Sequence, residues 1–364
     1  DLKMDAHCYG GFHNAMGKPQ VSVVIPVWNG ERYLKESIDS ILAQDFRAFE
    51  LIIVDDGSTD TTGEIIARYA GDPRVRAHRQ ENQGLVTALN VGLELSRADL
   101  IARLDADDVA RADRLSLQLA YLHGNLDVVA VGSSVELMDA DGRTLGIRRY
   151  PVGKEMATRG LLGGCTLAHP AVMMRKAAVL KVGTYRECFR HAEDYDLWLR
   201  LTDVGQVDNL PEALIRYRLH AQSVTKRHSA RQNFAAKAAL LLHRRRLSGE
   251  RVEDGLSSRP ISYHDLAALN LSVTEQADLA VARLALLFAD EASPAELEAA
   301  LEWTWGLRKH LDRGQYVRHG LMPGAWFLCS AKTGRPVRWL ARSFATEPLS
   351  ACWMLLKLTL GRNG

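Results

Sequence analysis

The chain of 364 residues lacks the sequence features of several large protein classes. Its five cysteines are scattered, odd in number and form no C-x-x-C pair: Cys8, Cys165, Cys188, Cys329 and Cys352. This pattern argues against a disulfide framework or a zinc site and favours a reducing compartment, so we expect a cytoplasmic protein. No apolar run approaches about eighteen residues, so the sequence predicts no transmembrane helix.

A net excess of charge is also missing. The chain has 46 Lys and Arg against 44 Asp and Glu, which gives +2 and argues against a general nucleic-acid binder. The 47% hydrophobic and 25% charged residues are ordinary for a globular protein whose length allows one large domain or two. Residues 1–19 lack the apolar core of a signal peptide, and we expect a flexible lead or expression remnant there.

Several motifs for phosphate and metal chemistry are absent as well. The segment 11–18 resembles a P-loop, but its glycine spacing is one residue too long and Pro19 follows the lysine. No G-x-G-x-x-G follows a strand pattern, and no G-x-S-x-G nucleophile elbow is present. The acids near position 105 are not an EF-hand, because Ala110 occupies the position of its turn glycine.

Apolar runs alternate with helical patterns in the first half of the chain. Strands are predicted at 21–25, 49–54, 75–78 and 99–104, with helices between them at 33–42, 62–69 and 85–95. This alternation is typical of an α/β fold with a mostly parallel sheet, and Pro26 is expected to close the first strand. After a helix at 111–123, an Asp-Gly turn at 138–142 predicts an antiparallel hairpin between strands 128–137 and 143–150.

Two of these strands end in carboxylates. Asp55 and Asp56 follow one strand, and Asp105, Asp107 and Asp108 follow another. The carboxyl ends of parallel strands meet at one edge of a sheet, where ligands bind in open α/β folds. Carboxylates gathered there suit a hard divalent cation, although a single D-x-D-D is also compatible with a solvated acidic turn.

A change of composition near residue 228 predicts a domain boundary between residues 20–228 and 229–364. Before it, 193–201 reads as a buried helix with an acidic first turn. Beyond it, alanine, leucine and arginine predict helices at 235–246, 263–268, 273–290 and 294–311. The tail from Leu321 interleaves basic residues with Trp, Phe and Leu, which suits a helix at an anionic membrane surface, a packing helix or an oligomer contact.

The motifs together resemble family 2 glycosyltransferases of the GT-A fold. Seven segments occur in the family's order: VSVVIPVWNGERYL (21–34), ELIIVDDGSTD (50–60), NQGLVTALNVGL (82–93), IARLDADD (101–108), HPAVMMRK (169–176), AEDYDLWLRL (192–201) and YRLH (217–220). The resemblance covers about residues 20–228. It implies a Rossmann-like, mostly parallel sheet flanked by helices, and we expect an α-helical C-terminal region after it.

The resemblance implies transfer of a sugar, with inversion, from a nucleotide diphosphate sugar to an acceptor hydroxyl. Asp107 and His220 would bind Mn²⁺ or Mg²⁺, and Asp105 would hold the ribose or a metal-bound water. The remaining donor-side positions are Pro26, Val27 and Asn29 around the base, Asp56 on the uracil edge, and Glu31, Gly84 and Asn90. The alternative for His220 is a structural role at the edge of the core, since imidazole serves both purposes.

An inverting transfer needs a base opposite the leaving group. Asp194 resembles the family's catalytic aspartate and Glu193 would orient it, although acids also favour a helix N-terminus for electrostatic reasons. His169 is a candidate sugar contact or a loop histidine that caps a strand.

We therefore expect a glycosyltransferase of bacterial surface polysaccharide or lipid-linked oligosaccharide synthesis, with a glycan or lipid-linked acceptor and peripheral contact with an anionic membrane. One alternative is a sugar nucleotidyltransferase, whose glycine-rich basic loop is missing after the first strand. The other is a non-catalytic, membrane-associated assembly partner, which would have no need for Asp105, Asp107 and Asp194 together.

Overall fold

The computed structural model describes residues 18–220, 229–250, 259–289 and 294–310. The chain divides into two compact units, one of residues 1–187 and 193–223 and the other of residues 188–192 and 224–364. The chain thus passes between units at 223, near the expected boundary at 228, and the short segment 188–192 also belongs to the second unit. The expected lead at 1–19 falls largely, and the basic aromatic tail entirely, outside the described residues.

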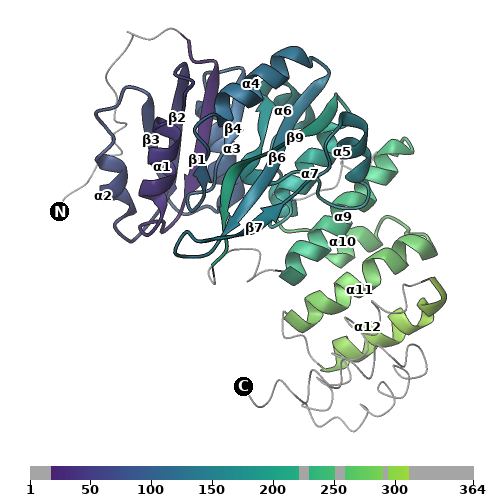
Figure 1. Ribbon diagram of the computed structural model, residues 1–364. Coiled ribbons are helices and arrows are strands. Elements are labelled where there is room, and N and C mark those ends of the chain that lie inside the picture. Colours follow the sequence, from purple (N-terminus) through teal and green to yellow (C-terminus); the bar gives the residue numbers. More distant parts are fainter. Residues whose placement is uncertain (1–17, 221–228, 251–258, 290–293, 311–364) are drawn as a thin grey trace. The chain divides into compact units, whose positions relative to one another are not determined.

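The first unit is built on a nine-stranded sheet in the described residues (Figure 1). Its strand order is β3-β2-β1-β4-β8-β6-β9-β5, and β7 pairs with β6 beside this path. The strands are β1 (Val21–Val27), β2 (Phe49–Asp56), β3 (Val75–Gln80), β4 (Leu100–Arg103), β5 (Val109–Ala110), β6 (Val128–Met138), β7 (Thr144–Arg148), β8 (Met173–Arg175) and β9 (Gln206–Arg218).

Strands β1 to β4 pair in parallel, as the alternating sequence pattern predicts. The second half is mixed, because β8 is antiparallel to β4 and β6 whereas β9 is parallel to β6. The second half of the sheet is therefore antiparallel only in part. The hairpin of β6 and β7 is confirmed, and Gly142 at its turn has φ 84°, which a glycine adopts without a steric penalty.

Helices cover both faces of the parallel strands. The helices of this unit are α1 (Leu34–Leu42), α2 (Thr62–Ala67), α3 (Leu85–Leu95), α4 (Arg114–Gly124), α5 (Lys154–Gly160), α6 (Lys176–Val182) and α7 (Glu193–Leu201). Successive strand residues face opposite sides, so Leu51 and Ile53 join the core with α1 and α4 while Ile52 and Val54 pack against Ala88 of α3. Burial on both faces explains the near-continuous apolar runs in these strands.

The prediction that Pro26 closes the first strand is wrong. β1 continues to Val27, and Pro26 pairs with Val54 of β2. The carbonyl of Val24 accepts a hydrogen bond from Leu104 on the β4 side, and Pro26, two residues later, faces the same side. Because β4 stops at Arg103, the missing N–H of Pro26 leaves no sheet hydrogen bond unmade.

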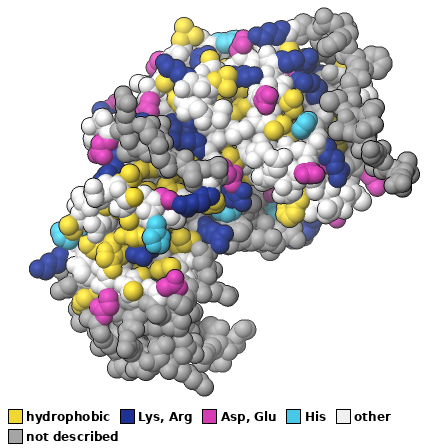
Figure 2. Space-filling view, turned by 180° about the vertical axis from the view of Figure 1, so that it is seen from behind, with side chains coloured by type: hydrophobic (Ala, Val, Ile, Leu, Met, Phe, Trp, Pro, Cys, Tyr) yellow, Lys and Arg dark blue, Asp and Glu magenta, His cyan; other side chains and the backbone are white. Residues whose placement is uncertain are grey.

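The second unit is helical where it is described. It contains α9 (Ser229–Leu247), α10 (Tyr263–Ala267), α11 (Val273–Ala289) and α12 (Pro294–Gly306). A capping box between Ser262 and Asp265 begins α10, and Arg245 of α9 pairs with Glu275 of α11 at 2.7 Å. Hydrophobic side chains gather on this unit in the view of Figure 2. Within the described ranges, none of the helices combines the length and hydropathy that crossing a bilayer requires.

Candidate active site

Three loops meet at the carboxyl edge of the parallel strands. They follow β1, β2 and β4, whose register places Val27 beside Asp55 and Val24 beside Arg103. The predicted donor-binding residues from 26 to 107 lie in these loops or at the ends of these strands, except that Gly84 directly precedes α3 and Asn90 lies in the middle of that helix. The parallel pairing therefore brings residues up to 81 positions apart to one edge of the sheet.

Asp56 organises the loop that contains Gly84. Its Oδ1 accepts hydrogen bonds from the Gln80 side chain at 2.8 Å and from the Gln83 N–H at 2.9 Å. Its Oδ2 accepts from the Gly84 N–H at 2.8 Å, and Gly84 has φ 90°, a conformation that disfavours other residues. Asp56 is 3% exposed, and its three hydrogen bonds hold the loop in place. A carboxylate has about four acceptor positions, so Asp56 can accept a hydrogen bond from one further donor.

The loops after β1 and β2 are tied together by the side chains of Asn29 and Glu31. The side-chain carbonyl of Asn29 accepts a hydrogen bond from the Thr59 N–H at 2.8 Å, and the backbone N–H of Asn29 donates to the Ser58 hydroxyl at 2.9 Å. Glu31 accepts from the Thr61 hydroxyl at 2.9 Å. These two predicted donor contacts thus join the two loops at this edge of the sheet, and Asn29 does so at φ 52°.

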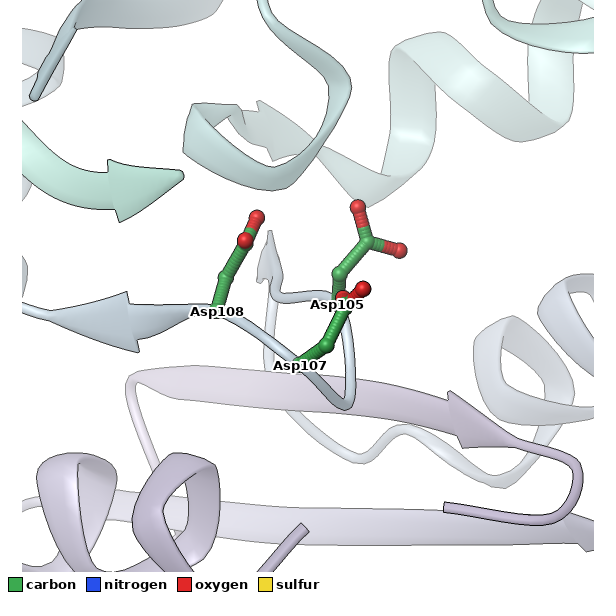
Figure 3. A group of neighbouring side chains, drawn as sticks. All are labelled: Asp105, Asp107 and Asp108. Carbon is green, nitrogen blue, oxygen red and sulfur yellow. The ribbon is translucent and has the colours of Figure 1, made fainter. Parts of the chain in front are cut away.

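Asp105, Asp107 and Asp108 form the acidic centre of the site. Figure 3 shows the three side chains projecting to the same side from one short loop after β4. One carboxylate oxygen from each lies within 4.8 Å of the others. Burial, followed by the neighbouring carboxylates, raises the pKa of Asp108 well above its usual range, and burial also raises the pKa of Asp105. The loop therefore concentrates negative charge where solvent screens it poorly.

Two arginines stabilise this acidic loop. Arg103, 3% exposed, forms an ion pair with Asp105. Arg218 of β9 donates through Nε to the Asp107 carbonyl at 2.8 Å, and its backbone N–H donates to Asp108 Oδ1 at 2.8 Å. Arg218 also pairs with Glu36 of α1, so the loop is attached to both a strand and a helix.

His220 reaches the acidic loop from the end of β9. Its Nε2 lies 2.7 Å from Asp107 Oδ2, and its ring lies 5.4 Å from that of Tyr33. The two residues expected to share a metal ion, Asp107 and His220, are therefore in contact although 113 positions separate them. No periodicity in the sequence predicts this contact, because it depends on the pairing of β9 with β5 and β6.

Asp194 lies at the N-terminus of α7 and interacts electrostatically with charged groups of the acidic centre. Burial raises the pKa of its carboxyl, the Arg103 guanidinium lowers it, and the charge on Asp105 raises it. The Tyr195 N–H donates to Asp194 Oδ1 at 2.7 Å, and Glu193 beside it is 5% exposed. A partly exposed carboxylate with a raised pKa is suited to accept a proton near neutral pH.

The start of α7 is held by buried ion pairs. Asp196 is 2% exposed and pairs with Arg200 at 2.7 Å and with Arg186 of the preceding loop. The Arg200 guanidinium also donates to the carbonyls of Val182 and Thr184. These contacts fix the position of the helix end that carries Asp194.

His169 and Asn90 meet at Tyr185. Asn90 Nδ2 donates to the Tyr185 carbonyl at 2.9 Å, and the Asn90 carbonyl accepts from the Tyr185 N–H at 3.0 Å. The Tyr185 hydroxyl lies 2.9 Å from His169 Nε2, and the His169 ring packs edge-on to Trp198 of α7. Burial lowers the pKa of His169 well below its usual range, so its imidazole is neutral at pH 7.

The acidic centre fits a divalent cation. Asp108 Oδ2 is buried without a hydrogen-bond partner, and three carboxylates with a histidine make an oxygen-rich donor set with one nitrogen. Such a set suits Mn²⁺ or Mg²⁺, whose charge would relieve the repulsion among the carboxylates.

Sequence reasoning named Asp108 among the strand-end carboxylates without giving it a role of its own, and it did not select Arg103 or Arg218 for this site. Asp108 and Arg103 lie inside the quoted segment IARLDADD, and Arg218 lies in YRLH, so the motifs contained them. The signal that could have marked the arginines is the need for buried positive charge beside several carboxylates.

An α/β sheet with an acidic centre at the carboxyl ends of its strands is typical of proteins that bind nucleotides at that edge. Residues 22–183 match the sequence model of Glycosyl transferase family 2. The putative glycosyltransferase EpsE of Bacillus subtilis is 35% identical over 216 residues, which cover 57% of this chain and 76% of EpsE. The O-antigen biosynthesis glycosyltransferase WbnJ of Escherichia coli is 35% identical over 211 residues, covering 57% and 82%. The chain therefore belongs to glycosyltransferase family 2.

Solved structures agree with this assignment at the level of the fold. The crystal structure of Staphylococcus aureus TarS 1–349 has a TM-score of 0.53 and 17% identity, over 94% of this chain and 92% of that one. TarS 1–349 in complex with UDP has a TM-score of 0.50 and 18% identity, over 74% and 82%. The GT-A fold expected from the sequence is thus confirmed.

Proposed function

We propose that the protein is a metal-dependent inverting glycosyltransferase. It would move a sugar from a nucleotide diphosphate sugar, with UDP as the carrier, to a hydroxyl of a glycan or lipid-linked glycan. The observation that carries this proposal is the arrangement of carboxylates. An acidic centre follows β4, a histidine is in contact with it, and Asp194 interacts electrostatically with Arg103 and Asp105 of the same site.

The relatives support the choice of donor and pathway. WbnJ is named for O-antigen biosynthesis, and TarS has been crystallised with UDP and with UDP-GlcNAc. By analogy we assign this chain a UDP-sugar donor and a role in bacterial surface polysaccharide synthesis. The tail from Leu321, outside the described residues, remains our candidate for peripheral contact with an anionic membrane on the basis of its sequence.

The donor would lie along the edge of the sheet. Asp56 has hydrogen-bonding capacity left for the uracil edge, and Pro26, Val27 and Asn29 stand at the end of β1 beside it. Asp105 would hold the ribose or a metal-bound water. Mn²⁺ or Mg²⁺, held by Asp107 and His220, would supply positive charge for the diphosphate leaving group.

Asp194 would act as the general base. Its carboxylate would take the proton of the acceptor hydroxyl as that oxygen forms a bond to the anomeric carbon. The bond between the anomeric carbon and the diphosphate oxygen would break on the opposite face, and its electron pair would leave with the nucleoside diphosphate. Glu193 would keep Asp194 oriented, and the neutral imidazole of His169 would contact the sugar or support Tyr185.

The first test is release of UDP. Wild-type protein incubated with UDP-glucose, UDP-galactose, UDP-GlcNAc or UDP-GalNAc and Mn²⁺ is expected to release UDP from at least one donor and to stop when EDTA is added. The same donor should raise the melting temperature, because a ligand that binds only the folded state stabilises it. Stabilisation by a donor without UDP release would instead favour the non-catalytic assembly partner.

The pH dependence follows from the environment of Asp194. Its base form must be present, and burial raises its pKa, so kcat/KM is expected to fall as the pH falls through a pKa higher than the usual value of about 3.9. Arg103, Asp105, Tyr150, Cys165 and Tyr185 are the charged or titratable groups that interact with it electrostatically. The measurement is kcat/KM against pH, with donor binding followed by thermal shift at each pH.

Measuring donor binding at each pH distinguishes titration of Asp194 from titration of the acidic centre. If the loss of kcat/KM at low pH follows the loss of donor binding, the titrating group belongs to the donor site and the assignment of Asp194 as base is contradicted. A profile that stays flat down to about pH 4 would contradict it as well.

A further inference from the structure

Exposed apolar side chains gather in one stretch of the first unit. Ten large hydrophobic side chains are exposed in the described residues, and five of them lie between 145 and 162: Leu145 58%, Ile147 53%, Val152 44%, Met156 63% and Leu162 42%. Single exposed hydrophobic residues are normal on a protein surface, whereas exposed hydrophobic side chains that lie together in space mark an interaction site. We call residues 143–162 the β7–α5 surface.

The geometry of β7 places two of these side chains together. Leu145 and Ile147 are two residues apart in the same strand, so they face the same side. β7 pairs only with β6 among the described strands, and four of its five residues are exposed. Edge strands usually carry charged or short side chains that prevent association, whereas this one presents a leucine and an isoleucine.

Basic side chains surround the apolar ones. The β7–α5 surface contains Arg143, Arg148, Arg149, Lys154 and Arg159 against the single acid Glu155. Lys154 pairs with Asp127 and Arg159 with Glu155, so the excess positive charge comes from the three other arginines, all exposed. Arginine stems pack on apolar groups while their guanidinium groups bind phosphates, a combination that suits the headgroup region of an anionic bilayer.

The β7–α5 surface borders the candidate active site through the turn that precedes β7. The carbonyl of Ala140 in this turn accepts a hydrogen bond from Arg218 at 3.3 Å, and Arg218 also donates to the Asp107 carbonyl. Tyr150, which follows β7, interacts electrostatically with the carboxylate of Asp194, which adds to the burial that raises the Tyr150 pKa. An acceptor embedded in a membrane at this surface would therefore arrive next to the proposed base.

We propose that the β7–α5 surface is a membrane-contact surface, which binds anionic phospholipid headgroups through Arg143 and Arg149 and inserts Leu145 and Ile147 at the acyl boundary. Its consequence, delivery of a lipid-linked acceptor to Asp194, rests on the proposed function. The contact itself does not, because vesicle binding requires no donor.

The test uses the full chain and vesicles of equal parts phosphatidylglycerol and phosphatidylcholine. Cosedimentation should show binding that weakens with salt and is lost on pure phosphatidylcholine. L145S/I147S and, separately, R143Q/R149Q are each expected to lower the affinity by about tenfold or more, with the rate of donor hydrolysis unchanged. Hydrogen–deuterium exchange should show protection of residues 143–162 when vesicles are added.

Matched controls are L126S/L180S, which remove two hydrophobic side chains at least as exposed as Ile147 elsewhere on this unit, and R47Q/R68Q, which remove two exposed arginines elsewhere on it. The proposal is overturned if the wild-type chain does not bind anionic vesicles, if the controls lose as much affinity, or if protection falls only outside 143–162. It is also overturned if L145S/I147S changes the sedimentation coefficient without vesicles, because the surface would then bind a second copy of the chain. Failure of UDP release leaves these outcomes unaffected.

Discussion

Replacing Asp194 with Asn is expected to lower kcat for sugar transfer by about 10³-fold while the affinity for the donor stays within about threefold of wild type. The amide keeps the size of the side chain and its bond from the Tyr195 N–H through the carbonyl oxygen, but it cannot accept a proton from the acceptor. The measurement is kcat and donor Kd for D194N and wild type under the same metal concentration.

The control for this variant is D113N, which removes an exposed carboxylate at the start of α4 that pairs with Arg111 at 2.5 Å. D113N should retain wild-type kcat. D194E tests geometry, because it restores a carboxylate one methylene too far along the side chain, and a partial recovery is expected. A D194N enzyme with more than about a third of the wild-type kcat would refute the role of Asp194 as base.

Replacing Asp107 with Asn is expected to lower kcat by about 10²-fold to 10³-fold and to raise the Mn²⁺ concentration needed for half-maximal activity. The variant loses one of the negative charges that hold the cation. It also removes a charge that contributes to the raised pKa values of Asp105 and Asp108, so the metal-free variant should be at least as stable as metal-free wild type.

Thermal unfolding distinguishes these two effects. Mn²⁺ should raise the melting temperature of wild type clearly and that of D107N little, because only bound cation stabilises the folded state. D141N is the matched control, since Asp141 is an exposed acid in the β6–β7 turn with only an exposed ion pair to Arg32. An equal melting-temperature increase in D107N and wild type would refute the assignment of Asp107 as metal ligand.

The electrostatics explain why both variants should matter. Burial raises the pKa of three carboxyl groups, those of Asp105, Asp108 and Asp194. The positive charge of Arg103 lowers all three pKa values and so offsets part of this effect. A site in which several carboxylates share one buried guanidinium is poised to accept further positive charge. This is the physical basis for assigning donor activation to the acidic centre and proton removal to Asp194.

Several predicted site residues form hydrogen bonds within the protein that the motif did not reveal. The side chains of Asn29, Glu31 and Asn90, which the resemblance implies as donor contacts, hold neighbouring loops through hydrogen bonds. A motif has the same residue at the same position whether its side chain holds a loop or contacts the ligand. The motif alone therefore does not separate these two roles. Their roles as donor contacts stay predictions.

Hydrophobic periodicity and the strand-end acids determined the α/β class, the parallel direction of the first four strands and the edge of the sheet that carries the site. These features are local: burial on both faces demands continuous apolar runs, and an acid after such a run must lie at the edge of the sheet. The sequence also determined the β6–β7 hairpin through its Asp-Gly turn.

Only the tertiary structure decided the features that join distant segments. The contact of His220 with Asp107, the attachment of Arg218 to the acidic loop and the extension of β1 through Pro26 all depend on which strands become neighbours. Strand pairing is set by the packing of the whole core, which no short window of sequence contains. For the same reason, the exposure of Leu145 and Ile147 beside the site became visible only once β7 had a single partner strand.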